Sequence, residues 1–254
     1  MTTLREAAEQ WREWFHRGEI EEGAARIREA LDAPGAETPS VERVRVLYAA
    51  HLFAFRSGEP SRAYAQEALD LARRLGDVRG ESDGLTGLAR AALRDGAYDE
   101  VARLAAEGVR KAREAGDPAA EGSPLHLQAV GLRLSGDYDA AREAYLKTLA
   151  LAEQLGDEQR MQMEFHNLGW VELHRGDIEA AERMFVERDA RSGLDAYGDA
   201  WQDLNAAGLA AARGQRARAA AYFESGREKL AALGVALDPD DQSEIDWLAG
   251  RLGR

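Results

Sequence analysis

The feature that most constrains this chain is a glycine-centred phrase that recurs at a nearly constant interval. Six glycines carry it, each followed by a small, acidic or amide residue: Gly18, Gly58, Gly96, Gly136, Gly176 and Gly214. Successive members are 40, 38, 40, 40 and 38 residues apart. A second phrase, Leu-Gly-Asp or Ala-Gly-Asp, ends at residues 77, 117 and 157, and its glycine lies 20 residues before the next glycine of the first series. Periodicity of this length is typical of repeat proteins, so each repeat is predicted to have two halves.

Each half is predicted to be one α-helix that ends at its glycine. Glycine readily adopts the left-handed conformation that terminates a helix, and an aspartate after it caps the next helix. Five aspartates are predicted to act as caps: Asp77, Asp117, Asp137, Asp157 and Asp177. Apolar residues between the glycines follow helical spacing, as at Phe165, Leu168 and Val171. The alternating pattern of strands is absent, which predicts an all-α fold.

The residue five positions after the turn glycine is Gly or Ala in five of the six repeats, and this pattern leads to a family resemblance. The six residues are Gly23, Ala63, Val101, Ala141, Ala181 and Ala219. A small side chain there lets the two helices of a hairpin approach closely. Together with Leu168-Gly169 before Gly176 and Phe185 after it, the pattern resembles the tetratricopeptide repeat. The resemblance covers about residues 2–233 and implies a right-handed α-solenoid of six antiparallel helical hairpins plus a C-terminal capping helix.

The pattern also departs from that family. Its period of 38–40 residues exceeds the usual 34 and looks like the arrays in bacterial transcription regulators and peptide-sensing regulators. The proline that often ends the repeat is missing. Trp11 and His51 stand where a small residue is usual, and terminal repeats of a solenoid are commonly atypical.

The expected organisation is a single domain of residues 1–254. Hairpins are expected at about 2–32, 41–75, 78–115, 118–155, 158–191 and 196–233, with a helix at 241–252 capping the last repeat and loops at 33–40 and 236–241. Gly80, Gly84 and Gly87, followed by Gly122 and Pro124, leave two interpretations of region 78–130. In one, the glycines are tolerated and the fourth hairpin starts late, with Ser123 as cap and Pro124 at its first position. In the other, the region is a hinge.

Composition excludes several classes of partner. Lys and Arg number 33 against 46 Asp and Glu, so the net charge of −13 disfavours binding to nucleic acid. No apolar run approaches the roughly 20 residues of a membrane span, and no secretory signal opens the chain. There is no cysteine. These features predict a cytoplasmic protein, and abundant arginine with scarce lysine hints at a bacterial source. Because the sequence starts inside the first hairpin, no attached DNA-binding or kinase domain is expected.

Catalytic motifs are not found, so the chain is not predicted to be an enzyme and no cofactor is expected. It has no phosphate-binding glycine loop and no His-x-x-x-His. A metal site from His126, His166 and His174 is conceivable, but no carboxylate completes it, and packing or groove-lining is the favoured interpretation. Acidic pairs such as Glu21-Glu22 and Asp240-Asp241 are predicted to be solvated caps.

The candidate binding residues follow from the resemblance, which implies that the first helix of each hairpin lines a groove. Asn167 and Asn205 each lie nine residues before a turn glycine, in equivalent places. An asparagine offers a donor and an acceptor, so this pair is predicted to clamp the backbone of a peptide. The alternative is that the pair bonds across helices and fixes the stack. The other predicted groove residues are His166, Trp170, Trp201, His126, Arg90 and Arg133, with the arginines favouring an acidic peptide.

Three hypotheses therefore remain. The leading one is a regulatory interaction scaffold that binds a peptide or an extended protein segment. The second is a structural protein that self-associates, for example as a homodimer. The third, an enzyme with an unfamiliar site in the groove, has the least support.

Overall fold

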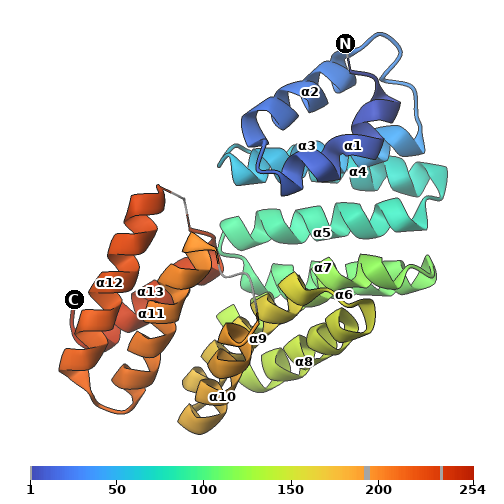
Figure 1. Ribbon diagram of the computed structural model, residues 1–254. Coiled ribbons are helices and arrows are strands. Elements are labelled where there is room, and N and C mark those ends of the chain that lie inside the picture. The colour runs from blue at the N-terminus through green and yellow to red at the C-terminus, as the bar shows by residue number, and fades with distance from the viewer. Residues whose placement is uncertain (1, 192–194, 235–236) are drawn as a thin grey trace. The chain divides into compact units, whose positions relative to one another are not determined.

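The computed structural model describes residues 2–191, 195–234 and 237–254, and within these ranges the chain is all-helical. The helices are α1 (Leu4–His16), α2 (Ile20–Asp32), α3 (Val41–Arg56), α4 (Arg62–Leu75), α5 (Val78–Arg94), α6 (Tyr98–Glu114), α7 (Pro118–Leu134), α8 (Tyr138–Leu155), α9 (Glu158–Arg175), α10 (Ile178–Asp189), α11 (Ala196–Ala212), α12 (Arg216–Leu233) and α13 (Pro239–Leu252). The first twelve form successive hairpins (Figure 1), which confirms the predicted repeat fold. We call α1, α3, α5, α7, α9 and α11 the first helices and their partners the second helices.

The turn between α9 and α10 illustrates why the glycine phrase ends one helix and begins the next. Gly176 has a φ of 84°, in the left-handed region that favours glycine. Its N–H donates to the carbonyl of Leu173 at 3.1 Å, and the N–H of Asp177 donates to Glu172 at 2.9 Å. The Asp177 carboxylate then accepts from the N–H of Ala180 at 2.9 Å. The other four predicted aspartates cap their helices in the same way.

Small residues allow the two helices of a hairpin to approach closely. A Cβ placed on Gly169 of α9 would lie 2.2 Å from Cε1 of Phe185 on α10. Ala181, five residues after the turn glycine, is fully buried in the same hairpin. The Phe185 ring therefore occupies the volume that a larger residue at 169 would need.

Gly84 and Gly87 of α5 allow close approach to α4 of the preceding hairpin, and α5 is continuous. A Cβ on Gly84 would lie 2.8 Å from the backbone of Leu69, and one on Gly87 would lie 2.8 Å from Ala65. These glycines bring α5 against α4, and this packing offsets their low helix propensity. A hinge in region 78–130 remains a prediction, and uniform amide protection through it would argue against one.

The late start predicted for the fourth hairpin is wrong. Helix α7 begins at Pro118, because Asp117 accepts from the N–H of Ala120 at 3.3 Å and a proline at the first position needs no donor. Pro124 lies inside the helix, where it packs close to Gly108 of α6.

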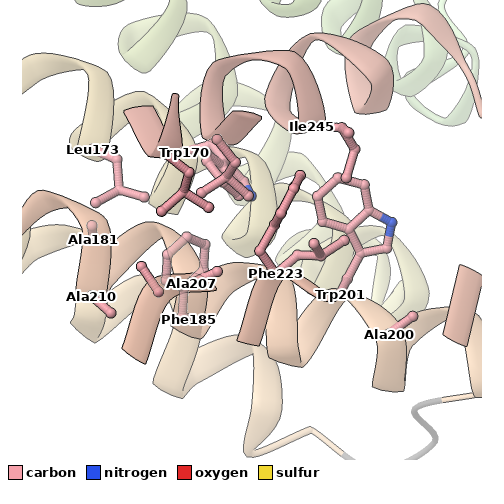
Figure 2. Close-up of a cluster of buried hydrophobic side chains, with 14 of the residues drawn as sticks. Trp170, Leu173, Ala181, Phe185, Ala200, Trp201, Ala207, Ala210, Phe223 and Ile245 are labelled. Carbon is pink, nitrogen blue, oxygen red and sulfur yellow. The ribbon is translucent and has the colours of Figure 1, made fainter. Parts of the chain in front are cut away.

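The chain divides into two compact units, which we describe separately. Unit 1 comprises Met1–Gln128 and unit 2 comprises Ala129–Arg254. A single domain of residues 1–254 remains a prediction. The core of unit 1 includes Trp11, Trp14 and Phe53. The core of unit 2 collects aromatic residues of α9, α10, α11 and α12 (Figure 2).

The predicted loop at 33–40 lies between α2 and α3. The second predicted loop is shorter than expected, since α13 already begins at Pro239 and residue 236 lies outside the described residues. Within the described ranges, no helix combines the length and apolarity needed to cross a bilayer.

Candidate functional site

In unit 1 the first helices bring aromatic and charged side chains onto a shared face. The rings of Trp11 and Tyr48 meet edge to face with centroids 6.0 Å apart. Burial raises the pKa of Tyr48, although the positive charge of Arg90 acts in the opposite direction. Burial also raises the pKa of Asp83, although its ion pair with Arg79 (3.3 Å) opposes this. Arg90 is half-buried, and its Nε forms no hydrogen bond within the part of the chain that the structure describes.

In unit 2, side chains of the first helices form an aromatic cluster that includes Trp170 and Trp201 (Figure 2). Trp170 of α9 and Trp201 of α11 meet edge to face with centroids 6.3 Å apart, and the His166 ring lies 4.8 Å from the Trp201 ring. Burial, with the charges of Arg188 and Arg133, lowers the pKa of His166 well below its usual value. His166 is therefore neutral at physiological pH and acts as an uncharged aromatic group.

The two asparagines make different bonds. Asn205 accepts a hydrogen bond from Nε1 of Trp170 at 3.0 Å, which connects α11 to α9. Asn167 donates from Nδ2 to the carbonyl of Met163 on its own helix, also at 3.0 Å. Both asparagines are buried, and Nδ2 of Asn205 has no partner among the described residues. The bond to Trp170 is the cross-helix contact of the structural alternative, while the peptide-clamp role stays a prediction.

Helix α13 contacts the first helices of unit 2 through Glu244, which lies against Arg133 and His174. Arg133 of α7 forms an ion pair with Glu244, and a second, longer one of 3.6 Å with Asp240. Oε2 of Glu244 also lies within hydrogen-bond distance of Nε2 of His174 on α9, at 3.0 Å. Glu244 is 1% exposed and Arg133 3% exposed, so both charged groups are removed from water. We define the α13-facing surface by five residues of the first helices: Arg133, Trp170, His174, Tyr197 and Trp201.

A further polar contact joins α13 to α11. The Tyr197 hydroxyl donates to the carboxylate of Asp241. Burial and the neighbouring Asp240 raise the pKa of Asp241 well above its usual value, although the Tyr197 hydrogen bond lowers it. The prediction that Asp240-Asp241 is a solvated pair is therefore wrong for Asp241, because α13 turns this side chain toward α11.

Apolar residues of α13 complete its contact with unit 2. Trp247 meets Trp170 with ring centroids 5.8 Å apart and meets His174 at 5.3 Å. Ile245 and Leu248 belong to the same buried cluster as Trp170 and Trp201 (Figure 2). Helix α13 thus contacts three first helices in addition to packing on α12, which is more than the predicted cap on the last repeat.

The predicted site residues fall into two groups. His166, Trp170, Trp201 and Asn205 are linked by contacts in unit 2, and the charge of Arg133 in the same unit acts on His166. Asn167 bonds within α9, while Arg90 and His126 lie in unit 1.

Sequence reasoning missed Tyr197, Glu244 and the contact role of Trp247. Their importance depends on where α13 packs, and spacing along the chain carries no signal for that.

His174 is also not where a metal site would need it. Its ring stacks on Tyr138 at 4.8 Å, and its Nε2 faces Glu244. Among the described residues, no group of three or more His, Asp and Glu side chains is arranged to hold a metal ion.

The sequence matches no protein-family model and no curated relative. Solved structures match along most of the chain. A Rap protein complexed with Competence and Sporulation Factor has a TM-score of 0.71 at 13% identity, over 98% of this chain and 74% of that chain. The fold is that of tetratricopeptide-like repeat proteins.

Two further structures are similar to this tetratricopeptide-like chain. The Rap conjugation gene regulator of the plasmid pLS20, in complex with the Phr* peptide, has a TM-score of 0.59 at 12% identity, over 98% of this chain and 84% of that one. BtubC from P. vanneervenii has a TM-score of 0.60 at 17% identity, over 92% of each chain. At these identities the similarity establishes the fold alone.

Proposed function

We propose that this chain is a regulatory interaction scaffold whose first helices bind a peptide or an extended segment of a partner protein. The observation that carries the proposal is the composition of the first-helix faces in both units. Tyr48 lies near Arg90 in unit 1, and Trp170, Trp201 and Arg133 belong to the first helices of unit 2. Tryptophan, tyrosine and arginine are the residues that dominate binding energy at protein interfaces.

The chemistry of these faces suits a peptide with acidic groups. The guanidinium of an arginine binds carboxylates in a fixed, often bidentate geometry. The aromatic rings supply apolar area at a low loss of side-chain entropy. The Rap regulator bound to the Phr* peptide lends support by its fold, since peptide binding by a similar helical array is physically feasible.

Binding rather than catalysis is the proposed activity. The histidines with lowered pKa values, His51 and His166, are packed among aromatic rings. The net charge of −13 repels phosphate backbones, which favours a protein partner over nucleic acid. The cysteine-free sequence is consistent with a cytoplasmic scaffold.

The test is selection of peptides from a random display library on the purified full chain, followed by photo-cross-linking of the enriched peptides. We expect cross-links on first helices such as α5, α9 and α11. Binding is expected to weaken about tenfold or more in Arg90→Ala, in line with the loss of a charged hot-spot residue. The matched control is Arg218→Ala, an exposed arginine on second helix α12.

Cross-links confined to second helices would refute the assignment of the face. If no peptide is enriched and light scattering finds a dimer, the self-associating alternative replaces the scaffold proposal. A strict monomer at high concentration counts against that alternative.

A further inference from the structure

Helix α13 lies against unit 2 as a bound ligand would. It reaches side chains from three first helices, namely Arg133 of α7, Trp170 and His174 of α9, and Tyr197 of α11. It does not continue the hairpin series, because it pairs with no second helix of its own. Arg133 and Trp170 are also face residues that the proposed function assigns to partner binding, so α13 already covers this part of the site.

The polar character of this contact is unusual for a helix that only caps a core. A buried ion pair such as Arg133–Glu244 adds little net stability, because both groups lose their hydration. It does add specificity, since an occupant without a carboxylate at that point leaves Arg133 buried and unpaired. Asp241 adds a second carboxyl group against Tyr197. The surface is therefore built to select an acidic occupant.

The surface also keeps unused hydrogen-bonding capacity while α13 is present. Nε of Arg133 is buried without a partner among the described residues. A buried donor without a partner is unfavourable. An occupant that supplies an acceptor to this Nε would bind this surface better than α13 does.

We propose that α13 is an intramolecular ligand of the α13-facing surface, and that the partner of this surface is an acidic amphipathic helix that displaces α13. The proposal rests on the proposed function and defines its partner chemistry. In α13 a carboxylate at 240 is followed four residues later by Glu244 and three residues after that by Trp247, with Ile245 and Leu248 beside them. The partner helix carries carboxylates and an aromatic residue on one face in this arrangement.

Displacement is physically accessible. An isolated helix of this length is only marginally stable in water, so α13 depends on its contacts with unit 2. A tethered segment competes with an effective concentration on the order of millimolar. A free partner must therefore bind the surface more tightly than α13 does, and any weakening of α13 raises the apparent affinity for the partner.

The test measures binding of a fluorescent synthetic peptide, residues 238–254 of this chain, to full-length variants. Glu244→Lys places a like charge beside Arg133 and removes the carboxylate that faces His174, and Trp247→Ala removes the ring that contacts Trp170 and His174. Each variant is expected to bind the peptide at least tenfold more tightly than the unaltered chain. The control is Asp246→Asn, because Asp246 is exposed on the opposite side of α13 and should leave affinity unchanged.

A charge exchange tests where the peptide binds. Trp247→Ala combined with Arg133→Glu should lose binding to the native peptide and regain it for a peptide carrying Glu244→Arg. Circular dichroism verifies that each variant is folded, and the Trp247→Ala chain serves as the second opened variant if Glu244→Lys unfolds. Equal binding to the unaltered chain and both opened variants, or undiminished binding after Arg133→Glu, would overturn the proposal.

Other occupants give distinct results. If the opened variants become dimers by light scattering, the occupant is α13 of a second copy and the partner proposed here is wrong. If library-selected peptides cross-link to first helices but the α13 peptide never binds, the scaffold function stands and this inference fails. If the α13 peptide binds opened variants while no library peptide is enriched, this inference stands and the broader proposal is restricted to helical ligands.

Discussion

Replacing Gly169 by alanine tests the steric basis of the hairpin. Alanine favours a helix over glycine by about 1 kcal/mol, so the substitution would be stabilising if space were available. A Cβ at this position would lie 2.2 Å from Cε1 of Phe185, and ordinary contact begins at 3.4 Å. The ring or the helix must therefore move by about 1.2 Å, the difference between these two distances.

The Phe185 ring has no free volume into which it can move. It is 3% exposed and packs against Trp170 and His166, with ring centroids 6.1 and 6.4 Å away. Overpacking a core by one methyl typically costs about 1–3 kcal/mol, and a clash with three ring atoms belongs at the upper end. We expect Gly169→Ala to lower the free energy of unfolding by about 1–2 kcal/mol after the gain in helix propensity.

The assay is urea unfolding followed by tryptophan fluorescence and circular dichroism, with Gly250→Ala as the matched control. Gly250 is a helical glycine in the same unit, and a Cβ there meets nothing within 4 Å. This control should be stabilised by about 0.5–1 kcal/mol. A double-mutant cycle with Phe185→Leu should show coupling between positions 169 and 185. If Gly169→Ala is as stable as Gly250→Ala, the close-approach argument is wrong.

Three further predictions concern the interior and α13. Asn205→Ala should lower the free energy of unfolding by about 1–3 kcal/mol, because Trp170 loses a buried acceptor. Asn167→Ala should lower it by about 0.5–1.5 kcal/mol, because its bond lies within one helix. Equal losses for the two variants in urea unfolding would contradict this assignment. Burial lowers the pKa of His51 to about 4, so the folded state resists protonation and stability falls as the pH drops from 6.5 toward 4. At pH 5 this loss of stability is about 2 kcal/mol. His51→Gln should therefore reduce the difference between the free energies of unfolding at pH 7 and pH 5 by this amount. Gly250→Ala should stabilise the helical conformation of α13 and so weaken binding of the added 238–254 peptide about two- to fivefold in a fluorescence titration. Unchanged affinity for the peptide would count against competition by α13.

Most of the helical architecture was predictable because its determinants are local. A glycine such as Gly176 and a capping aspartate such as Asp177 act within a few residues of the chain, so their spacing reports the turn directly. The expected bound of 118 for the fourth hairpin agrees with the start of α7, and only the interpretation of a late start was wrong, because two proline positions were available. Asp117 and Pro118 satisfy the first turn, and this outweighs the loss of one donor at Pro124.

The candidate site was less predictable because it depends on contacts between distant segments. The tryptophans at 170 and 201 could be assigned to one face from the repeat, and their rings do meet. Pairing of Arg133 with Glu244 joins positions 111 residues apart, and no repeat equivalence connects them. The destination of α13 is set by tertiary packing, so its acidic residues looked like ordinary solvated caps.

The most direct test of the central claim is hydrogen exchange in the full-length, isotopically labelled protein with and without unlabelled 238–254 peptide. At millimolar peptide we expect amides of α13 to exchange faster while α11 keeps its protection, because the peptide replaces α13 on an intact surface. Unchanged exchange in α13 at saturating peptide would contradict the account. So would equal loss of protection in α13 and α11, since that pattern indicates unfolding of unit 2 rather than displacement of one helix.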